Sequence, residues 1–396
     1  MLQDDLMKML PWNYGVRNLG RSPVRTGLCI GSAMLISLIA IGASGVIGGL
    51  ERSLKTEIPP DVAVVFGAGS EDSLERSDID ARTASLIAAS VPGIRSIDDM
   101  EYISPEVIMA VSLDMDDQKR PVLALARGMT ESAFLLHKNV QIIKGRAPIA
   151  GRNEIMVGEL APVKMGLEPA RLEVGSSLQF DGIDWKIVGQ FVAPGSMHGS
   201  EIWIPLSDLM VATKRQGLSA VYVEMDPGSG GEIGDLESFA FKRLDLELIA
   251  IPLKEYYERL DEFYGPIKLV VWATAILIAI GTCFAGINTM YAAFAGRIRE
   301  FAMLRCLGWR PIAIGISLVQ ETIVSSAAGA LLGCALGLLV LDGMQVRFTM
   351  GAFKLLVGPE QLLLALCAGI GIAVIGVIPP AMRCLGKPLN ESLKSM

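Results

Sequence analysis

Long charge-free stretches dominate the pattern of hydrophobic and polar positions along this chain. Each of four such stretches has at least the ~20 apolar residues that a bilayer-spanning helix needs, and only Glu321 interrupts one of them. The pattern predicts an α-helical membrane protein with four transmembrane helices, at residues 26–50, 267–296, 311–341 and 361–382. Because the first stretch is longer than the apolar core of a secretory signal, we expect it to be a retained anchor.

Basic residues gather beside particular ends of these stretches. They precede the first helix, fill the turn between the second and third, and follow the fourth: Lys8, Arg17, Arg21, Arg25; Arg297, Arg299, Arg305, Arg310; Arg383, Lys387, Lys394. Because cytoplasmic flanks retain positive charge, both termini are expected in the cytoplasm, as an amphipathic segment (1–25) and a tail (383–396). Residues 51–266 and a short loop (342–360) are then extracytoplasmic. Trp12 to Leu19 is expected to lie along the inner membrane surface, with a disordered tail as the alternative.

Composition and charge support this division. The chain is 51% hydrophobic with a mean hydropathy of +0.46, which is too apolar for a set of soluble domains. Residues 51–266 hold 21 Lys and Arg against 35 Asp and Glu, a net charge of −14, whereas the remainder holds 14 against 7, a net charge of +7. An acidic outer segment argues against a nucleic-acid partner. All six cysteines lie in or beside the membrane segments, so the outer segment must fold without disulfides.

The outer segment alternates between strand-like and helix-like patterns. Residues 61–66, 102–113, 220–224 and 246–251 read as strands, and residues 80–90 and 233–243 read as helices. Two βαβ halves on either side of an insertion predict a split ferredoxin-like subdomain in a large α+β domain. The middle, roughly residues 121–207, has short strands and Gly turns, so we expect a separate β-rich subdomain there.

Two amphipathic segments flank this domain. Apolar residues from Leu253 to Tyr264 recur at three- and four-residue spacing, which predicts a helix that runs towards the second membrane span with a kink at Gly265-Pro266. Residues 50–58 leave the first span in a comparable way. We expect a helical stalk that holds the outer domain; a plain loop between independent units is the alternative.

The basic turn at residues 297–310 has a helical pattern of its own. Ile298, Phe301, Leu304 and either Leu307 or Gly308 fall on one face, which predicts a short helix parallel to the membrane. Gly308 is suited to the left-handed residue that ends a helix. Such an element could insert into a groove on another protein; a simple positively charged loop is the alternative.

The residues of this turn resemble a known family. Arg299-Glu300-Phe301-Ala302-Met303-Leu304-Arg305-Cys306-Leu307-Gly308, followed by Gln320-Glu321, resembles the signature of the FtsX-like permeases. In the outer segment, Lys144-Gly145-Arg146, Asn153 to Gly158 and Ile187 to Phe191 are similar to the MacB-type periplasmic core domain. The resemblance covers nearly the whole chain, in order.

This resemblance implies the permease subunit of a mechanotransmission-type ABC transporter in the bacterial inner membrane. It implies partners: a cytoplasmic ABC ATPase subunit, a second permease copy or paralogue that forms a dimer, membrane lipid and, left open, a periplasmic adaptor. The cargo would be a lipid, lipoprotein, peptide or small toxic compound, exported or extracted. The alternative is a signal transducer that regulates a cell-wall hydrolase or a sensor without transport, and a more distant one is a receptor with an outer ligand domain.

Candidate functional residues fall into three groups. The coupling contact with the ATPase is assigned to Arg297, Arg299, Glu300, Phe301, Leu304, Arg305, Leu307 and Gly308; transmission within the membrane to Glu321; and helix packing to Gly329, Gly333 and Gly337. For Glu321, a hydrated position near the interface is the alternative. The sequence has no G-x-x-x-x-G-K-[ST] loop, so we expect no enzyme activity and no cofactor here, with ATP and Mg²⁺ used by the partner. His137 and His198 lie far apart in sequence and predict no metal site, and no catalytic group stands out.

Overall fold

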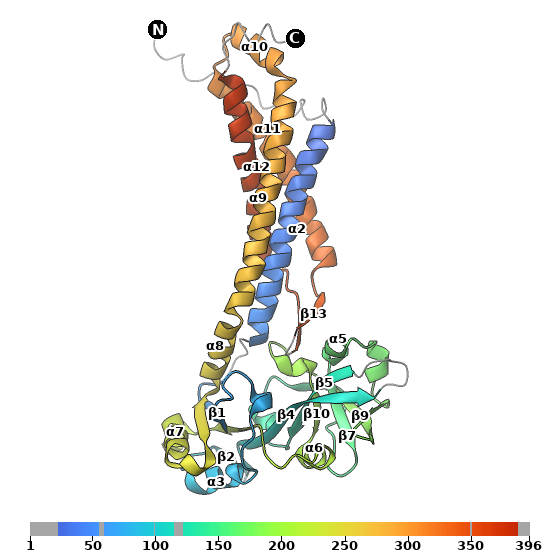
Figure 1. Cartoon of the computed structure of the whole chain (residues 1–396), viewed down its shortest axis with the longest axis vertical. Coiled ribbons are helices and arrows are strands. Elements are labelled where there is room, and N and C mark those ends of the chain that lie inside the picture. The colour runs from blue at the N-terminus through green and yellow to red at the C-terminus, as the bar shows by residue number, and fades with distance from the viewer. Residues whose placement is uncertain (1–22, 55–58, 99, 115–121, 349–350, 387–396) are drawn as a thin grey trace. The chain divides into compact units, whose positions relative to one another are not determined.

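The computed structural model describes residues 23–54, 59–98, 100–114, 122–348 and 351–386 of the 396-residue chain (Figure 1). The predicted amphipathic segment at residues 1–22 and most of the C-terminal tail lie outside these ranges. The chain forms two compact units. The helical unit comprises Met1–Gly48, Pro266–Met344 and Leu355–Met396, and the sheet unit comprises Gly49–Gly265 and Gln345–Lys354.

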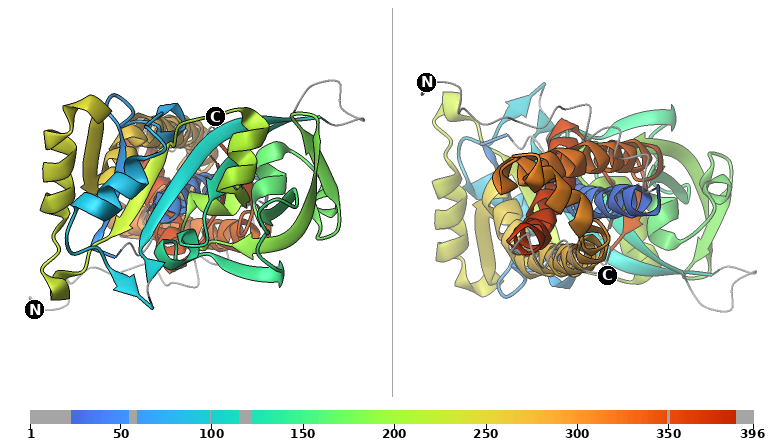
Figure 2. Two further views of the ribbon diagram at one scale, coloured as in Figure 1. Left: turned by 90° about the horizontal axis from the view of Figure 1, so that it is seen from below. Right: turned by 90° about the horizontal axis from the view of Figure 1, so that it is seen from above.

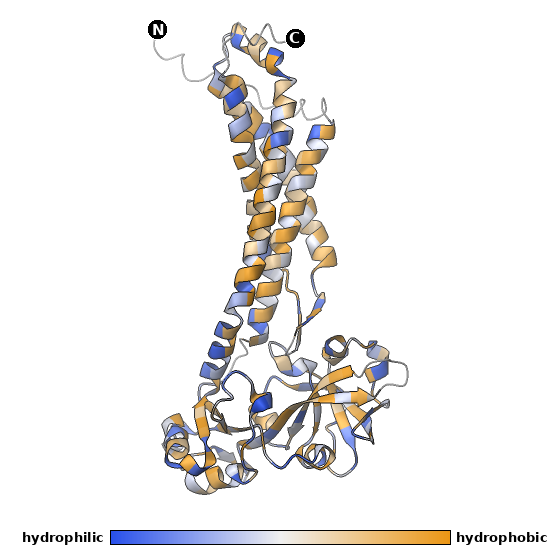
Figure 3. Ribbon diagram, in the orientation of Figure 1, coloured by the Kyte–Doolittle hydropathy of each residue, from blue (hydrophilic) through white to orange (hydrophobic). Residues whose placement is uncertain are grey.

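The helical unit is built from four long helices. They are α2 (Pro23–Leu54), α9 (Gly265–Ala295), α11 (Pro311–Val340) and α12 (Pro359–Leu385), and each is long and apolar enough to cross a membrane (Figure 3). The short helix α10 (Ile298–Cys306) connects α9 and α11. A single residue, Tyr264, separates helix α8 (Leu253–Phe263) from α9, where the Gly265-Pro266 kink was expected.

The sheet unit contains one continuous ten-stranded sheet. Its order is β12-β1-β11-β4-β5-β10-β7-β9-β6, and β8 pairs with β4 and β9. The strands are β1 (Val62–Gly67), β4 (Ile103–Asp114), β5 (Val122–Met129), β6 (Gln141–Gly145), β7 (Glu154–Gly158), β8 (Ser177–Phe180), β9 (Ile183–Val192), β10 (Ile202–Pro205), β11 (Ala220–Glu224) and β12 (Leu248–Pro252).

Two helices cover one end of this sheet. β12, β1, β11 and β4 are antiparallel neighbours, with α3 (Thr83–Ser90) between β1 and β4 in the chain and α7 (Ile233–Lys242) between β11 and β12. α3 and α7 lie side by side over these strands (Figure 2). The remaining helices are α4 (Ala133–Leu136), α5 (Ala161–Met165) and α6 (Leu206–Thr213).

Strand β4 joins the two halves of the sheet. Its first residues pair with β11 and its later residues, Val107–Leu113, pair with β5. One hydrophobic core runs under both halves, from Val65 in β1 to Trp185 in β9. The β-rich segment therefore continues the same sheet and does not form the separate subdomain that was expected, because β4 is long enough to serve two neighbours.

The connection between α11 and α12 is a β-hairpin, where the sequence predicted only a short loop. β13 (Gln345–Arg347) pairs with β14 (Ala352–Lys354), and both belong to the sheet unit. Lys354 Nζ lies 2.5 Å from Glu159 Oε1, and Lys164 Nζ donates to the Phe348 carbonyl at 3.0 Å. The chain therefore passes between the two units four times.

Candidate functional site

Helix α10 has one face packed inside its own chain. Ile298, Phe301 and Ala302 are buried, and Phe301 contacts a cluster that includes Phe294 of α9 and Leu385 of α12. Leu304 is half-buried against the same cluster. Gly308, at φ 93°, takes the left-handed conformation that was expected just past the end of the helix. The buried face of α10 therefore packs against the ends of the long helices.

The opposite face of α10 is exposed. Met303 is 56% exposed and Leu307 77% exposed, and Arg299 lies one turn before Met303 on the same side. These three residues, at positions i, i+4 and i+8, form what we call the outer stripe. Met303 and Leu307 therefore offer two large apolar side chains that another protein could cover.

Glu321 is the centre of an ion-pair cluster. It is buried in α11 and pairs with Arg25 at the start of α2, and its other oxygen lies 3.5 Å from Arg297 Nη1. Arg297 immediately precedes α10, donates from Nε to Glu300 at 3.0 Å, and lies 5.3 Å from the centre of the Phe301 ring. The cluster thus joins α2, α10 and α11, which are distant in sequence, at one carboxylate.

The surroundings of Glu321 are buried and charged. The residue is 7% exposed, and its carboxylate faces two guanidinium groups of the same chain. The Nη2 atom of Arg297 is buried without a hydrogen-bond partner among the described residues. A buried donor without a hydrogen-bond partner carries a cost in free energy, so the cluster is not fully satisfied.

The glycines of α11 bring it close to α2. A Cβ built on Gly329 would overlap the Ile30 carbonyl, and one on Gly333 would come 2.7 Å from the Met34 carbonyl. Gly337 faces the Ile41 side chain at 2.6 Å. The three residues predicted to pack helices therefore all face α2, where only a missing side chain allows the backbones to approach. Gly27 and Gly31 of α2, in contrast, face open space.

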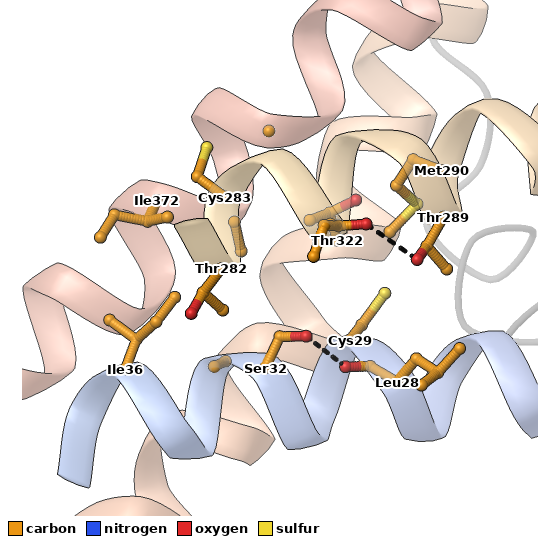
Figure 4. A pocket seen from close by; sticks show the side chains of 15 residues that line it. Leu28, Cys29, Ser32, Ile36, Thr282, Cys283, Thr289, Met290, Thr322 and Ile372 are labelled. Carbon is orange, nitrogen blue, oxygen red and sulfur yellow. Dashed lines mark hydrogen bonds between the residues drawn. The ribbon is translucent and has the colours of Figure 1, made fainter. Parts of the chain in front are cut away.

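A small cavity lies between the long helices. It has a volume of about 160 Å³ and is lined by residues of α2, α9, α11 and α12, including Cys29, Thr282 and Thr322 (Figure 4). The hydroxyls of Ser32, Thr282 and Thr322 each donate to a carbonyl four residues earlier in their own helix. The cavity wall therefore presents mainly methyl groups, and it is a poor path for a polar substrate.

A second buried ion cluster lies in the sheet unit, and the sequence did not predict it. Arg127 of β5 donates from Nε to Glu201 Oε2 at 2.6 Å and from Nη2 to Glu201 Oε1 at 2.8 Å, and it also pairs with Glu106 of β4. His137 lies 2.8 Å from Glu106 and His198 lies 3.3 Å from Glu201. The two histidine rings are 4.6 Å apart, although they are 61 positions apart in the sequence.

Burial and charge set the protonation of this cluster. Burial alone would raise the pKa of Glu106, but His137 and Arg127 outweigh it and hold the pKa at about 2. Burial lowers the pKa of His198 to about 4, against the opposing effect of Glu201. His198 is therefore neutral at physiological pH. A cavity of about 70 Å³ lies between the cluster and Tyr256 and Tyr257 of α8.

The family model of the MacB-like periplasmic core domain matches residues 26–232, just over half of the chain, and that of the FtsX-like permease C-terminal domain matches residues 272–389. The chain belongs to the MacB/FtsX-type permease family. It is therefore an ABC transporter permease, a membrane protein with a periplasmic α+β domain, as the sequence predicted.

Individual relatives of this permease are distant. The macrolide export ATP-binding/permease protein MacB of Shewanella sp. (strain W3-18-1) is 20% identical over 377 residues, which cover 89% of the chain and 55% of the relative. The chain thus spans about half the length of this curated relative. Among solved structures, the periplasmic region of MacB from Actinobacillus actinomycetemcomitans is 11% identical, with a TM-score of 0.38 over 52% of this chain and 94% of that one. The extracellular domain of the noncanonic ABC-type transporter YknZ from Gram-positive bacteria is 12% identical, with a TM-score of 0.35 over 48% and 99%.

The structure separates the residues that were assigned to the coupling contact of this permease. Arg297 and Phe301 face inwards, Arg305 donates to the Leu385 carbonyl at 3.4 Å, and Arg299, Leu307 and Gly308 are exposed. Met303 was not assigned, yet it lies between Arg299 and Leu307 on the outer stripe. Hydrophobic periodicity could not identify it, because that signal marks the face that the chain buries.

Proposed function

We propose that this permease is the transmembrane subunit of a mechanotransmission-type ABC transporter, driven by ATP and Mg²⁺ in a separate nucleotide-binding subunit. The observation that carries the proposal is the division of α10 into a buried face and the outer stripe. A partner that binds Met303 and Leu307 would contact the outer face of a helix whose inner face packs against α9, α11 and α12. Both termini are placed in the cytoplasm with α10, following the positive-inside rule.

The proposed path of force runs from α10 to the periplasmic domain. Arg297 and Glu321 tie α10 to α11 and, through Arg25, to α2. The chain then enters the sheet unit from α2 and from α11, and leaves it into α9 and α12. In the sheet unit, α8 lies beside the buried cluster of Arg127 across a small cavity, and this rigid ion network would receive the movement. We interpret strands β12, β1, β11 and β4, with helices α3 and α7, as a split ferredoxin-like subdomain. This subdomain would move as one body on a stalk that includes α8.

The transporter is proposed to handle its cargo on the periplasmic side of the membrane. Among the described residues, the helix bundle offers a cavity lined mainly by apolar groups and one buried carboxylate that already pairs with two arginines, so these residues provide no prepared path for a polar substrate. We therefore propose export or extraction of a lipid, lipoprotein, peptide or small toxic compound. The relative named a macrolide export protein supports this class. A second permease copy completes the transporter, with membrane lipid around it and a periplasmic adaptor where the cargo must travel further.

The described residues of the bundle provide no polar path, and this observation also favours a second candidate function. A signal transducer that regulates a cell-wall hydrolase or a sensor needs the same force path and no cargo site. Finding such an enzyme bound to the sheet unit, together with ATP hydrolysis that moves no cargo, would decide for the transducer.

A photocrosslinking experiment tests the proposal. Benzoylphenylalanine is placed at Met303, at Leu307 and, as a matched control on the inner face of α10, at Phe301, and cells of the native host are illuminated. We expect crosslinks from positions 303 and 307 to a subunit with an ATP-binding cassette, identified by mass spectrometry, and only internal crosslinks from 301. If 303 and 307 capture no such subunit while the full-length permease is present in the membrane, the proposal is wrong.

A further inference from the structure

The sheet unit has a large groove at the ends of two parallel strands. β5 and β10 pair in parallel, with Met129 opposite Pro205 at their last residues, and α4 and α6 follow these strands. The connection between β6 and β7 forms the third wall through Ala147–Ala150. The groove has a volume of about 920 Å³. Crevices outside the carboxyl ends of parallel strands are where α/β sheets commonly bind ligands.

The third wall of this groove is held at both ends. The Arg146 guanidinium donates two hydrogen bonds of 2.6 Å to Glu154, and the Ile149 amide donates to the same carboxylate at 3.0 Å. The Gly151 amide donates to both oxygens of Asp208 in α6, at 3.0 and 2.8 Å. The hydrogen bonds from Arg146 lower the pKa of Glu154 to about 2, so this clamp stays ionised at physiological pH. A wall that is fixed in advance reduces the entropy that a ligand must lose on binding.

The lining of the groove is apolar with a single charge. Its larger apolar side chains are Met129, Phe134, Pro148, Ile149, Leu206 and Met210, and methionine side chains can adapt to different shapes. Glu131 is the one ionisable side chain among the lining residues. In the part of the chain that the structure describes, no hydrogen bond or ion pair involves its carboxylate.

The charges around the groove favour a cation. Asp208, in the first turn of α6, offsets the positive end of that helix, so the helix does not favour an anion in the groove. The segment that contains the groove, residues 51–266, has a net charge of −14, which raises the local concentration of cations. The volume of about 920 Å³ lies within the range of small-molecule sites, which is roughly 300–1,000 Å³.

We propose that this groove is a binding site for small apolar molecules that carry one protonated amine. The apolar body occupies the space between α4, α6 and the β6–β7 connection, and the amine lies against Glu131. The site is a property of the sheet unit alone, so its occupation depends neither on an ATPase nor on transport.

Ligand-observed ¹⁹F NMR on the full chain in lipid nanodiscs tests this proposal. The probes are 3-[4-(trifluoromethyl)phenyl]propylamine, the corresponding alcohol and the corresponding carboxylic acid, with empty nanodiscs measured to subtract lipid partition. We expect the amine to bind about three- to five-fold more tightly than the alcohol, and the acid to bind most weakly. This ratio corresponds to the upper part of the range of binding free energy that an exposed ion pair contributes. Glu131→Gln should abolish the difference between amine and alcohol and retain binding of the alcohol.

Two substitutions in α6 separate the groove from its surroundings. Met210→Trp fills the groove and should abolish binding of amine and alcohol, whereas Val211→Trp, on a neighbouring residue that is 76% exposed and outside the groove, should leave both unchanged. Ala150→Trp fills the groove from the opposite wall, should have the same effect as Met210→Trp, and replaces it if that variant unfolds. Equal affinity for amine and alcohol in the wild type, tighter binding of the acid, binding that survives both filling substitutions, or no binding at all would overturn the proposal.

Discussion

Replacing Glu321 by Gln removes the carboxylate that joins α2, α10 and α11. Arg25 and Arg297 would then lie near each other at a buried position, and Glu300, which pairs with Arg297, would be the remaining counter-charge of the cluster among the described residues. Breaking a buried ion pair by removing one partner typically costs about 3–5 kcal/mol. The cost here should lie near the lower end of that range, because Arg25 is only two residues from the start of α2 and its long side chain can reach the headgroup region.

A double-mutant cycle isolates the contribution of the pair. We expect Glu321→Gln and Arg25→Gln each to lower the free energy of unfolding of the permease. Because the two residues are in contact, the double variant should lose about 1–3 kcal/mol less than the sum of the two single losses. Unfolding of the full chain is measured in nanodiscs by steric trapping. Gln320→Ala, the preceding residue in α11, is the matched control and should change stability little.

The same variants test the role of the cluster in transmission. If Glu321 carries movement from α10 to α2, Glu321→Gln should lower transport relative to the ATP hydrolysed by the partner, whereas Gln320→Ala should leave that ratio unchanged. Free-energy changes that add within about 0.5 kcal/mol would refute the pairing. Unchanged ATPase and transport values in Glu321→Gln would refute the transmission role.

Three further predictions concern stability. Gly329→Ala should destabilise the helix packing by about 1–3 kcal/mol through overlap with the Ile30 backbone, whereas Gly27→Ala, which faces open space, should be neutral or slightly stabilising; thermal unfolding in nanodiscs compares the two. Arg127→Gln removes the cation that the buried carboxylates of Glu106 and Glu201 share and should cost about 3–5 kcal/mol in chemical denaturation of the sheet unit within the full chain. Burial lowers the pKa of His198 to about 4, so only the unfolded chain takes up a proton as the pH falls from 6.5 towards 4. Stability should therefore decrease by about 1–2 kcal/mol between pH 6.5 and pH 5, and His198→Gln should remove that decrease.

The sequence predicted the elements of this chain better than their contacts. Charge-free runs located the four long helices, and the residue pattern placed β11 at Ala220–Glu224, where the structure has it. Both signals are local: length and apolarity for a membrane helix, alternation and turn residues for a strand. The expectation of a separate β-rich subdomain was wrong because β4 pairs with β11 through its first residues and with β5 through its later ones, and nothing in its own residues indicates two neighbours.

The ion clusters could not be predicted, because they depend on contacts between distant parts of the chain. Glu321 was expected to face protein, but its partner could not be named. Arg25 is 296 positions away, and the sequence pattern assigned it to the basic flank of the first helix. His137 and His198 were set aside for their separation in sequence, and the fold brings their rings together through β4, α4 and the turn before β10. The sequence did contain a signal for the second cluster. Glu106, Arg127 and Glu201 lie within or beside apolar strands, and charged side chains at such positions need partners when they are buried.

The central claim is that α10 lies in the cytoplasm while the sheet unit lies on the other side of the membrane. Cys306 is an exposed native thiol of α10, and Val211 is an exposed position of α6. In a chain with the other five cysteines replaced, a membrane-impermeant maleimide added to spheroplasts should label Val211→Cys and leave Cys306 unlabelled, and inverted vesicles should give the opposite result. Labelling of both thiols from the same side would contradict the account.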